Sequence, residues 1–305
     1  MLSIQLKNGA PYAIIQYLIR NTGIVNMFDY HIHSFYSGDI PEGMGSTVAE
    51  LCETAIFRGF TEIAITDHFD VDGIYYGAFP KLDLEGVYRD VFEAKDRYAD
   101  KLSVLFGLEI GQAIHMPKES KRLIDRFPFD YIIGSVHSVR GIVDISFLDL
   151  DKMGNEELLM LWKDYISEMK ELIDWGYFDT LAHITYPYRY LKLAGREKLL
   201  DLEKNGREIF EPILRAIIRK GISLEVNTSG LRQGVGQTLP GFDLIRFYRE
   251  LGGELITVGS DAHHARDIGM DIRETIIKLK EIGFDHITGY KNREPYMEKI
   301  TNIIY

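Results

Sequence analysis

The sequence has a single cysteine among its 305 residues, Cys52, so it can form no intramolecular disulfide. It also has no run near the roughly 18 consecutive apolar residues that a membrane span requires. The partly apolar stretch 10–19 is not followed by the small-residue cleavage site of a secretory signal. These absences predict a cytoplasmic protein with no membrane partner.

Basic residues are also in the minority, because 35 Lys and Arg stand against 46 Asp and Glu, which gives a formal net charge of -11. That balance argues against a broad surface for nucleic acid or anionic lipid. We therefore expect no extended nucleic-acid partner. The sequence also has no glycine-rich phosphate loop, since the stretch from Gly230 to Gly241 has neither P-loop nor dinucleotide-binding spacing.

What the sequence does have is a regular alternation of apolar β-type runs and helical patterns from Met27 onward. Residues 1–26 are predicted to be an N-terminal helical leader, and 27–305 a single domain. Strands are expected at 28–33, 61–66, 102–109, 130–136, 177–182, 222–226 and 255–259. Helices are expected to open at the Thr47–Glu50 capping box and at about 83–99, 117–126, 155–174, 196–219, 242–251 and 266–282. Gly206 and Pro212 are expected to break the 196–219 segment, and the tail is expected to hold a strand and a short helix.

The most informative stretch is the first strand, which ends in His31-Ile-His33. Side chains two residues apart leave the same face of a strand, so the two imidazoles lie side by side. A lone pair of this kind would more often be structural. Here, however, five of the other six predicted strands also end at or just before potential metal ligands, namely His68, Glu109, His137, His183, and Asp261 with His263.

Seven βα units can form either an open doubly wound sheet or a closed barrel. The ligand-type residues favour the barrel, because it brings all strand carboxyl ends together whereas an open sheet spreads them out. The predicted fold class is therefore α/β, a distorted (βα)7 TIM-like barrel.

The ordered motifs resemble those of the PHP (polymerase and histidinol phosphatase) superfamily. The motifs are His31-x-His33, Thr66-Asp-His68, Gly107-Leu-Glu109, Ser135-Val-His137, Ala182-His183 and Gly259-Ser-Asp261-Ala-His263. The resemblance implies a distorted (βα)7 barrel that holds two or three metal ions. It implies a first site of His31, His33, Glu109 and Asp261, and a second of Glu109, His137 and His183. It implies a third of His68, His263 and Asp39, where some members have histidine in place of Asp39.

Chemistry independent of the resemblance agrees with a metal centre. Six histidines and three carboxylates without a thiolate suit Zn, Mn or Fe. Metal ions about 3.5–4 Å apart can bridge a hydroxide and polarise a phosphoryl oxygen, so no serine or cysteine nucleophile is needed.

Two arginines are candidates for binding phosphate through a planar, bidentate fork. Arg232 ends a stretch, Glu225 to Arg232, that resembles the histidinol-phosphatase branch of the family, and Arg189 lies six residues beyond His183. For each, the alternative is a surface salt bridge. Asp261 or His263 could donate a proton to the leaving group only if metal does not fully occupy it. Asp67 is expected to support its neighbours rather than ligate, whereas His115, His264 and His286 stay outside the ligand set.

The predicted function is hydrolysis of a small phosphate monoester, with histidinol phosphate as the expected substrate, by a metal-bridged hydroxide. One alternative is a phosphodiesterase, nuclease or nucleotide phosphatase with the same metal chemistry. The other is a non-catalytic metal-binding domain, against which the complete ligand set argues.

Overall fold

The computed structural model describes residues 26–41, 43–75 and 83–301, so the predicted leader lies outside the described residues except for Asn26. Seven parallel strands pair in the order β1-β2-β4-β5-β6-β7-β8. They are β1 (Phe28–Ile32), β2 (Glu62–Ile65), β4 (Ser103–Gly111), β5 (Tyr131–Ser135), β6 (Thr180–Leu181), β7 (Ser223–Asn227) and β8 (Ile256–Gly259). A short strand, β3 (His68–Asp70), continues the path of β2 along β4.

The two ends of this sheet meet, which makes the barrel nearly closed. Ile32 and Ala262 form a parallel bridge between β1 and the chain that leaves β8. The His33 amide donates to the Ala262 carbonyl at 2.8 Å, and the Asp261 amide donates to the His31 carbonyl at 2.8 Å. The predicted (βα)7 barrel is thereby confirmed, and all strand carboxyl ends share one rim.

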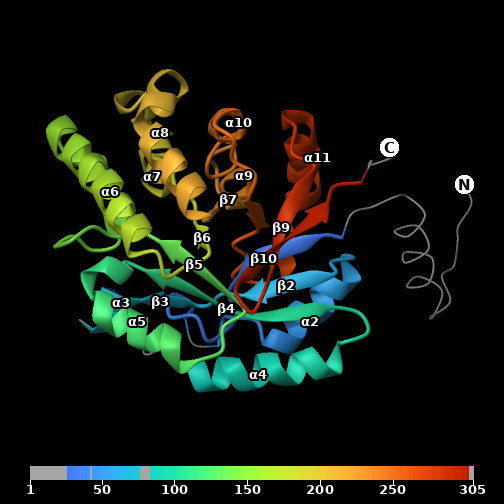
Figure 1. Cartoon of the computed structure of the whole chain (residues 1–305). Helices are drawn as coiled ribbons and strands as arrows, with labels where there is room; N and C mark the ends of the chain where they lie inside the picture. The colour runs from blue at the N-terminus through green and yellow to red at the C-terminus, as the bar shows by residue number, and fades with distance from the viewer. Residues whose placement is uncertain (1–25, 42, 76–82, 302–305) are drawn as a thin grey trace, which may run out of the picture.

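Helices cover the outside of the strands (Figure 1). They are α2 (Val48–Phe57), α3 (Val71–Tyr75), α4 (Leu84–Arg97), α5 (Pro117–Arg126), α6 (Asn155–Trp175), α7 (Tyr186–Leu193), α8 (Leu202–Lys220), α9 (Ser229–Arg232), α10 (Phe242–Glu250) and α11 (Ile272–Ile282). Short 3-10 turns lie at Ala113–His115, Ile145–Phe147, Glu197–Leu199 and Ala265–Asp267. Thr47 and Glu50 form the predicted capping box at the start of α2. Within the described part of the chain, no helix is long and apolar enough to cross a bilayer.

Three local predictions were wrong. Helix α8 continues through Pro212, because its buried face, including Phe210 and Leu214, packs inward and outweighs the missing amide hydrogen bond. The predicted helix at 266–282 begins only at Ile272, after positive φ at Gly269 and Asp271. The tail holds no helix at 294–299 but a second strand.

That tail is a hairpin of β9 (His286–Lys291) and β10 (Glu294–Lys299). Asn292 and Arg293 turn it with φ of 50° and 67°, as two-residue hairpin turns require. The hairpin crosses the amino ends of the barrel strands, opposite the rim described above. Its contacts are Tyr290 amide to Tyr30 hydroxyl at 2.8 Å, Tyr290 hydroxyl with Ser223 hydroxyl at 2.7 Å, Tyr296 hydroxyl to Glu62 carboxylate at 2.6 Å, and Arg293 amide to Asp130 carbonyl at 2.8 Å.

Gly259, the last residue of β8, packs closely against His31 and Glu225 near the rim. A Cβ there would overlap the Cβ of His31 and lie 2.9 Å from Glu225 Oε1. Gly259→Ala should therefore lower the free energy of unfolding by about 1–3 kcal/mol, the usual cost of overpacking, as measured by urea denaturation. The control is Gly206→Ala on α8, where the nearest atom would be 3.5 Å away and no loss is expected. Equal stability of Gly259→Ala and wild type would contradict the prediction.

Candidate metal centre

The structure brings all nine predicted ligands to the carboxyl rim of the barrel. His31 lies in β1 and His33 follows it, His68 begins β3, and Glu109 lies in β4. His137, His183 and Asp261 each lie two residues beyond the ends of β5, β6 and β8. Asp39 and His263 complete the cluster from the loops after β1 and β8. Strand geometry thus accounts for the convergence of the other seven residues, and the two loops supply Asp39 and His263.

Glu109 is the centre of the cluster and is fully buried. Its Oε1 lies 3.0 Å from His183 Nε2 and 3.1 Å from His137 Nε2. Its Oε2 lies 3.0 Å from His31 Nε2, 3.1 Å from His68 Nδ1 and 3.6 Å from His33 Nε2. The two oxygens therefore face different groups of imidazoles, as a carboxylate shared between two ions would.

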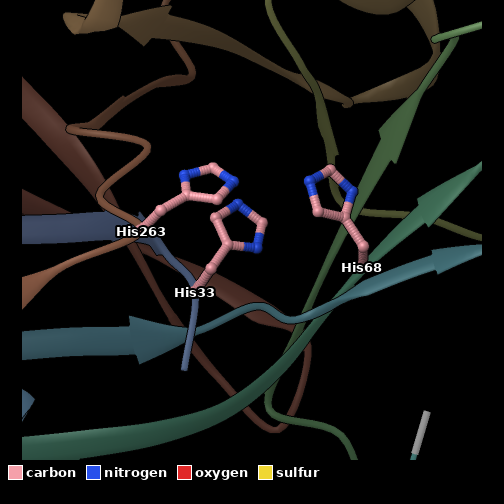
Figure 2. Close-up of side chains that lie close together, drawn as sticks. All are labelled: His33, His68 and His263. Carbon is pink, nitrogen blue, oxygen red and sulfur yellow. The ribbon is translucent and has the colours of Figure 1, made fainter. Parts of the chain in front are cut away.

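A second group of imidazoles lies nearer the mouth of the site. Figure 2 shows His33 and His263 close together and His68 facing them. The rings of His33 and His68 stack at 4.3 Å between centroids, and His33 and His263 are also 4.3 Å apart. Asp39 Oδ2 joins this group at 2.6 Å from His263 Nε2 and 3.7 Å from His68 Nε2. The predicted third ligand set is thus brought together.

The donor atoms fit divalent metal ions. Four trios have ligand atoms within 4.8 Å of one another: His33, His68 and His263; His31, Glu109 and His183; His31, His33 and Asp261; and His68, Asp70 and His137. In a tetrahedral zinc site with bonds near 2.1 Å, ligand atoms lie about 3.4 Å apart. His137 Nε2 and His183 Nε2 are 3.4 Å apart, and His33 Nε2 lies 3.4 Å from Asp261 Oδ1. Among the described residues, His33 Nε2 also has no hydrogen-bond partner, which leaves it available to a metal.

The outer nitrogens of three imidazoles are held by groups that were not in the predicted set. Glu225 Oε1 lies 2.6 Å from His31 Nδ1, Asp70 Oδ1 lies 2.8 Å from His137 Nδ1, and the Ser37 hydroxyl lies 3.2 Å from His33 Nδ1. Such contacts fix the ring orientation and tautomer of metal-binding histidines. Asp70 stands two residues after His68 in β3, so the same-face rule could have found it.

The pKa shifts follow from packing these charges together. Burial alone would raise the pKa of Glu109, but the imidazoles of His68, His31 and His137 hold it well below its usual range. Burial lowers the pKa of His68, but Glu109 and Asp39 reverse this and raise it to about 10. His33 differs, because burial together with His263 and His68 lowers its pKa to about 3. A metal ion that bound these residues would have to displace protons from them, so its affinity would fall with falling pH.

Two of the predicted ligands have an unusual backbone. His183 and Asp261 have φ of 21° and 54°, a region that non-glycine residues seldom adopt. The His183 amide donates to Glu225 Oε2 at 2.8 Å. Arg232 donates from Nη1 to the Ser260 carbonyl at 2.6 Å and from Nη2 to the Asp261 carbonyl at 2.7 Å. These hydrogen bonds hold the two ligand loops in place.

A cavity of about 460 Å³ opens onto the metal-ligand cluster. Arg189 lines it, whereas Arg232 is not among the described residues that do. The Arg189 side chain is buried, donates from Nη2 to the Ser229 hydroxyl at 2.8 Å, and lies over the Tyr186 ring at 5.5 Å. This geometry favours Arg189 as the arginine that contacts substrate, and gives Arg232 a contact with the backbone of the Asp261 loop.

The residues left outside the ligand set lie as follows. Asp67 accepts from the Ser34 amide at 2.5 Å and hydroxyl at 2.7 Å, and so anchors the loop after β1. His264 precedes a 3-10 turn, and His286 begins β9. His115 lies between Asp72 and Glu168, away from the cluster.

A family model described as "PHP domain" matches residues 29–229, which include the first seven predicted ligands along the chain. The chain belongs to the PHP family.

Two relatives and one solved structure are similar to most of this PHP protein. Histidinol-phosphatase of Lactococcus lactis subsp. lactis is 30% identical over 267 residues, which cover 86% of this chain and 93% of that one. Histidinol-phosphatase of Bacillus subtilis is 26% identical, over 79% and 95% of the two chains. The crystal structure of the Lactococcus lactis histidinol phosphate phosphatase, complexed with zinc, L-histidinol and phosphate, superposes with a TM-score of 0.74. It has 25% identity and covers 89% of this chain and 99% of that one.

The position of Glu109 generates the first test of this centre. Glu109→Gln keeps the shape but removes the charge shared by both groups of imidazoles. We expect it to lose metal from both sites with little change of fold, as measured by elemental analysis and circular dichroism after purification without chelator. Glu211→Gln, a half-exposed change on α8, is the control and should keep the wild-type metal content. Full metal content in Glu109→Gln would show that this carboxylate is not a shared ligand.

His115 generates a second, pH-dependent test. Its Nδ1 lies 2.7 Å from Asp72 and its Nε2 2.6 Å from Glu168. Burial lowers its pKa, but hydrogen bonds to the two carboxylates raise it to about 9 from 6.5. A folded-state pKa above the unfolded value stabilises the fold fully below pH 6.5, and this stabilisation is lost as pH rises through 9.

We therefore expect His115→Gln to cost about 1.5–3 kcal/mol at pH 6 and much less at pH 9.5. Urea denaturation of variant and wild type at both pH values gives the difference directly. A difference that does not change with pH would show that His115 is not held protonated.

Proposed function

We propose that this chain hydrolyses histidinol phosphate, with release of inorganic phosphate, at the rim cavity. It is a PHP-family phosphatase of the histidinol-phosphatase kind, and a small phosphate monoester is the substrate class that fits. The observation that carries the proposal is the cavity itself, which is lined both by predicted metal ligands and by the buried guanidinium of Arg189 beside Asp261.

We assign the ions as the resemblance implied. His31, His33, Glu109 and Asp261 would hold the first, Glu109, His137 and His183 the second, and His68, His263 and Asp39 the third. When bound, two or three ions of Zn, Mn or Fe would supply a hydroxide nucleophile near neutral pH and neutralise charge on the phosphoryl oxygens.

Arg189 would bind the phosphate. Its Nη2 is 3.9 Å from Asp261 Oδ2, so it is close to a proposed metal ligand, and its buried Nε has no partner among the described residues. A guanidinium that is fixed before substrate arrives stabilises charge on the phosphoryl oxygens without reorganisation. Arg232 would act one step further back, through the carbonyls of Ser260 and Asp261.

Further residues that line the cavity suit the histidinol part of the substrate. Asp144 lines the cavity and is oriented by the Tyr186 hydroxyl at 2.9 Å and the Ser146 amide at 2.7 Å. A carboxylate there can accept from the ammonium group that histidinol carries. Tyr186 and Tyr190 add aromatic surface for its ring.

Proton donation to the leaving alkoxide is assigned to His263 rather than Asp261. Asp261 is a carboxylate at neutral pH, because its imidazole neighbours outweigh burial and hold its pKa well below its usual range. Burial lowers the pKa of His263, but its hydrogen bond to Asp39 raises it overall. His263 has this role only while no third ion occupies it.

The proposal is tested by phosphate release from histidinol phosphate, other small monoesters, nucleotides and phosphodiesters, with metal content measured on the same sample. We expect histidinol phosphate to have the highest kcat/KM and diesters to be hydrolysed poorly. A preference for a diester or a nucleotide would overturn the proposed substrate. Absence of hydrolysis after loading with Zn, Mn and Fe in turn would overturn the enzyme itself.

Arg189 generates the matching variant. Arg189→Lys keeps the charge but loses the planar fork, and Arg189→Ala loses both. We expect kcat/KM for the monoester to fall roughly ten- to a hundredfold, more for Ala than for Lys, with metal content unchanged because arginine does not ligate.

Arg232→Ala is the matched comparison for Arg189→Ala. If Arg232 holds the Asp261 loop, this variant should retain metal less well. If instead it raises KM while metal content stays at the wild-type level, Arg232 is the phosphate clamp that the sequence predicted.

A further inference from the structure

A buried asparagine, Asn227, lies directly behind the metal-ligand cluster. It ends β7 and is completely inaccessible to solvent. It stands two residues after Glu225, so both side chains leave the same face of the strand. Its Nδ2 lies 3.3 Å from Glu225 Oε2 and 3.2 Å from Asp261 Oδ2. Carboxylates only accept hydrogen bonds, so the amide nitrogen must face these two groups.

The amide oxygen of Asn227 is occupied as well. It accepts from the Ser229 amide at 3.0 Å and from the Ser229 hydroxyl at 2.5 Å. The Ser229 hydroxyl in turn accepts from Arg189 Nη2 at 2.8 Å. Both N–H groups and the carbonyl of this side chain are therefore used, and no other residue type of this size offers two donors and an acceptor.

These contacts link Asn227 to two predicted metal ligands, His31 and Asp261, and to Arg189. Glu225 uses its other oxygen to hold His31 Nδ1 at 2.6 Å, so Asn227 supports His31 through Glu225. Asn227 also holds Oδ2 of Asp261, while Oδ1 of the same carboxylate lies 3.4 Å from His33 Nε2. Through Ser229 it reaches Arg189, whose Nη2 lies 3.9 Å from Asp261 Oδ2.

We propose that Asn227 is a positioning residue that aligns two ligands of the first metal, His31 and Asp261, with the phosphate-binding Arg189. Its effect on the ligands stands on geometry alone, whereas the link to Arg189 rests on the proposed function. A residue that only filled space in the core would influence neither metal retention nor substrate affinity specifically.

The ligand part is tested by metal release. Asn227→Asp keeps the size, removes both donors and sets a third carboxylate against Glu225 and Asp261. We expect one ion of the zinc-loaded variant to be about 10- to 100-fold more easily removed by a competing chelator, with the remaining ions held as in wild type. The control is Asn205→Asp on α8, whose amide donates to the Leu200 carbonyl and which should release zinc as wild type does.

A second variant tests the link from Asn227 to Arg189 separately from its support of the metal ligands. Ser229→Ala removes the hydroxyl between Asn227 and Arg189, together with its 3.3 Å contact to Asp261 Oδ2, but keeps the backbone hydrogen bond to Asn227. Because the Asn227 donors to Glu225 and Asp261 remain, we expect KM for the monoester to rise about 3- to 10-fold, with zinc released less easily than from Asn227→Asp. Thermal unfolding of each variant reports whether its fold is intact. If Asn227→Asp does not fold, Asn227→Ala, which adds no charge, takes its place in the release measurement.

Wild-type zinc release from a folded Asn227 variant would overturn the proposal. Equal loosening of every ion in Asn227→Asp and Ser229→Ala would also overturn it, since that would indicate a general structural effect. Chelator competition requires no catalysis. Absence of phosphatase activity in the wild type would therefore overturn the proposed function and leave the test of Asn227 standing.

Discussion

The site depends on the burial of one carboxylate, Glu109, among five imidazoles. A lone ionised carboxylate in a barrel interior would be unstable, and so would a group of protonated histidines. Together they compensate each other, which is why the pKa of Glu109 is lowered while those of His31, His68 and His137 are raised. The strand that carries Glu109 pairs with β2 and β3 on one side and β5 on the other, so the carboxylate has a rigid support.

Closure of the barrel extends this compensation to residues far apart in the chain. His31 and Asp261 are separated by most of the sequence, yet the Asp261 amide donates to the His31 carbonyl at 2.8 Å. The same closure places Glu225 of β7 behind the imidazole of β1. Main-chain pairing therefore sets the spacing of the ligands, and the side-chain contacts refine their orientation. A site of this kind requires little from its loops beyond Asp39 and His263.

Sequence patterns predicted the fold and the clustering of the nine candidate ligands because both depend on the same two-residue periodicity. Each apolar run predicted a strand, and the polar residue that ended it predicted a position on the rim. What the patterns could not predict depends on contacts between distant segments. Glu225 could be told from ordinary acidic residues only once His31 lay beside it. Arg189 and Arg232 have equal chemistry, and only the packed structure shows which of them lines the cavity. The predicted break at Pro212 was wrong because the burial of one face of α8 outweighs the hydrogen bond that proline removes. The helix predicted in the tail was wrong because residues 294–299 pair as a strand with β9, which lies in the tail itself.

The hairpin of β9 and β10 has a consequence for how this protein can change over evolutionary time. It ties together the amino ends of the strands through Tyr30, Glu62, Asp130 and Ser223, while the metal ligands occupy the carboxyl ends. The contacts that stabilise the barrel through the hairpin and the residues predicted to bind metal thus lie at opposite ends of the barrel. Substitutions at the hairpin pole can adjust thermal tolerance without disturbing the ligands, and substitutions on the cavity wall can alter substrate preference without loosening the frame. A barrel divided in this way is a scaffold on which new phosphatase specificities can arise by few steps.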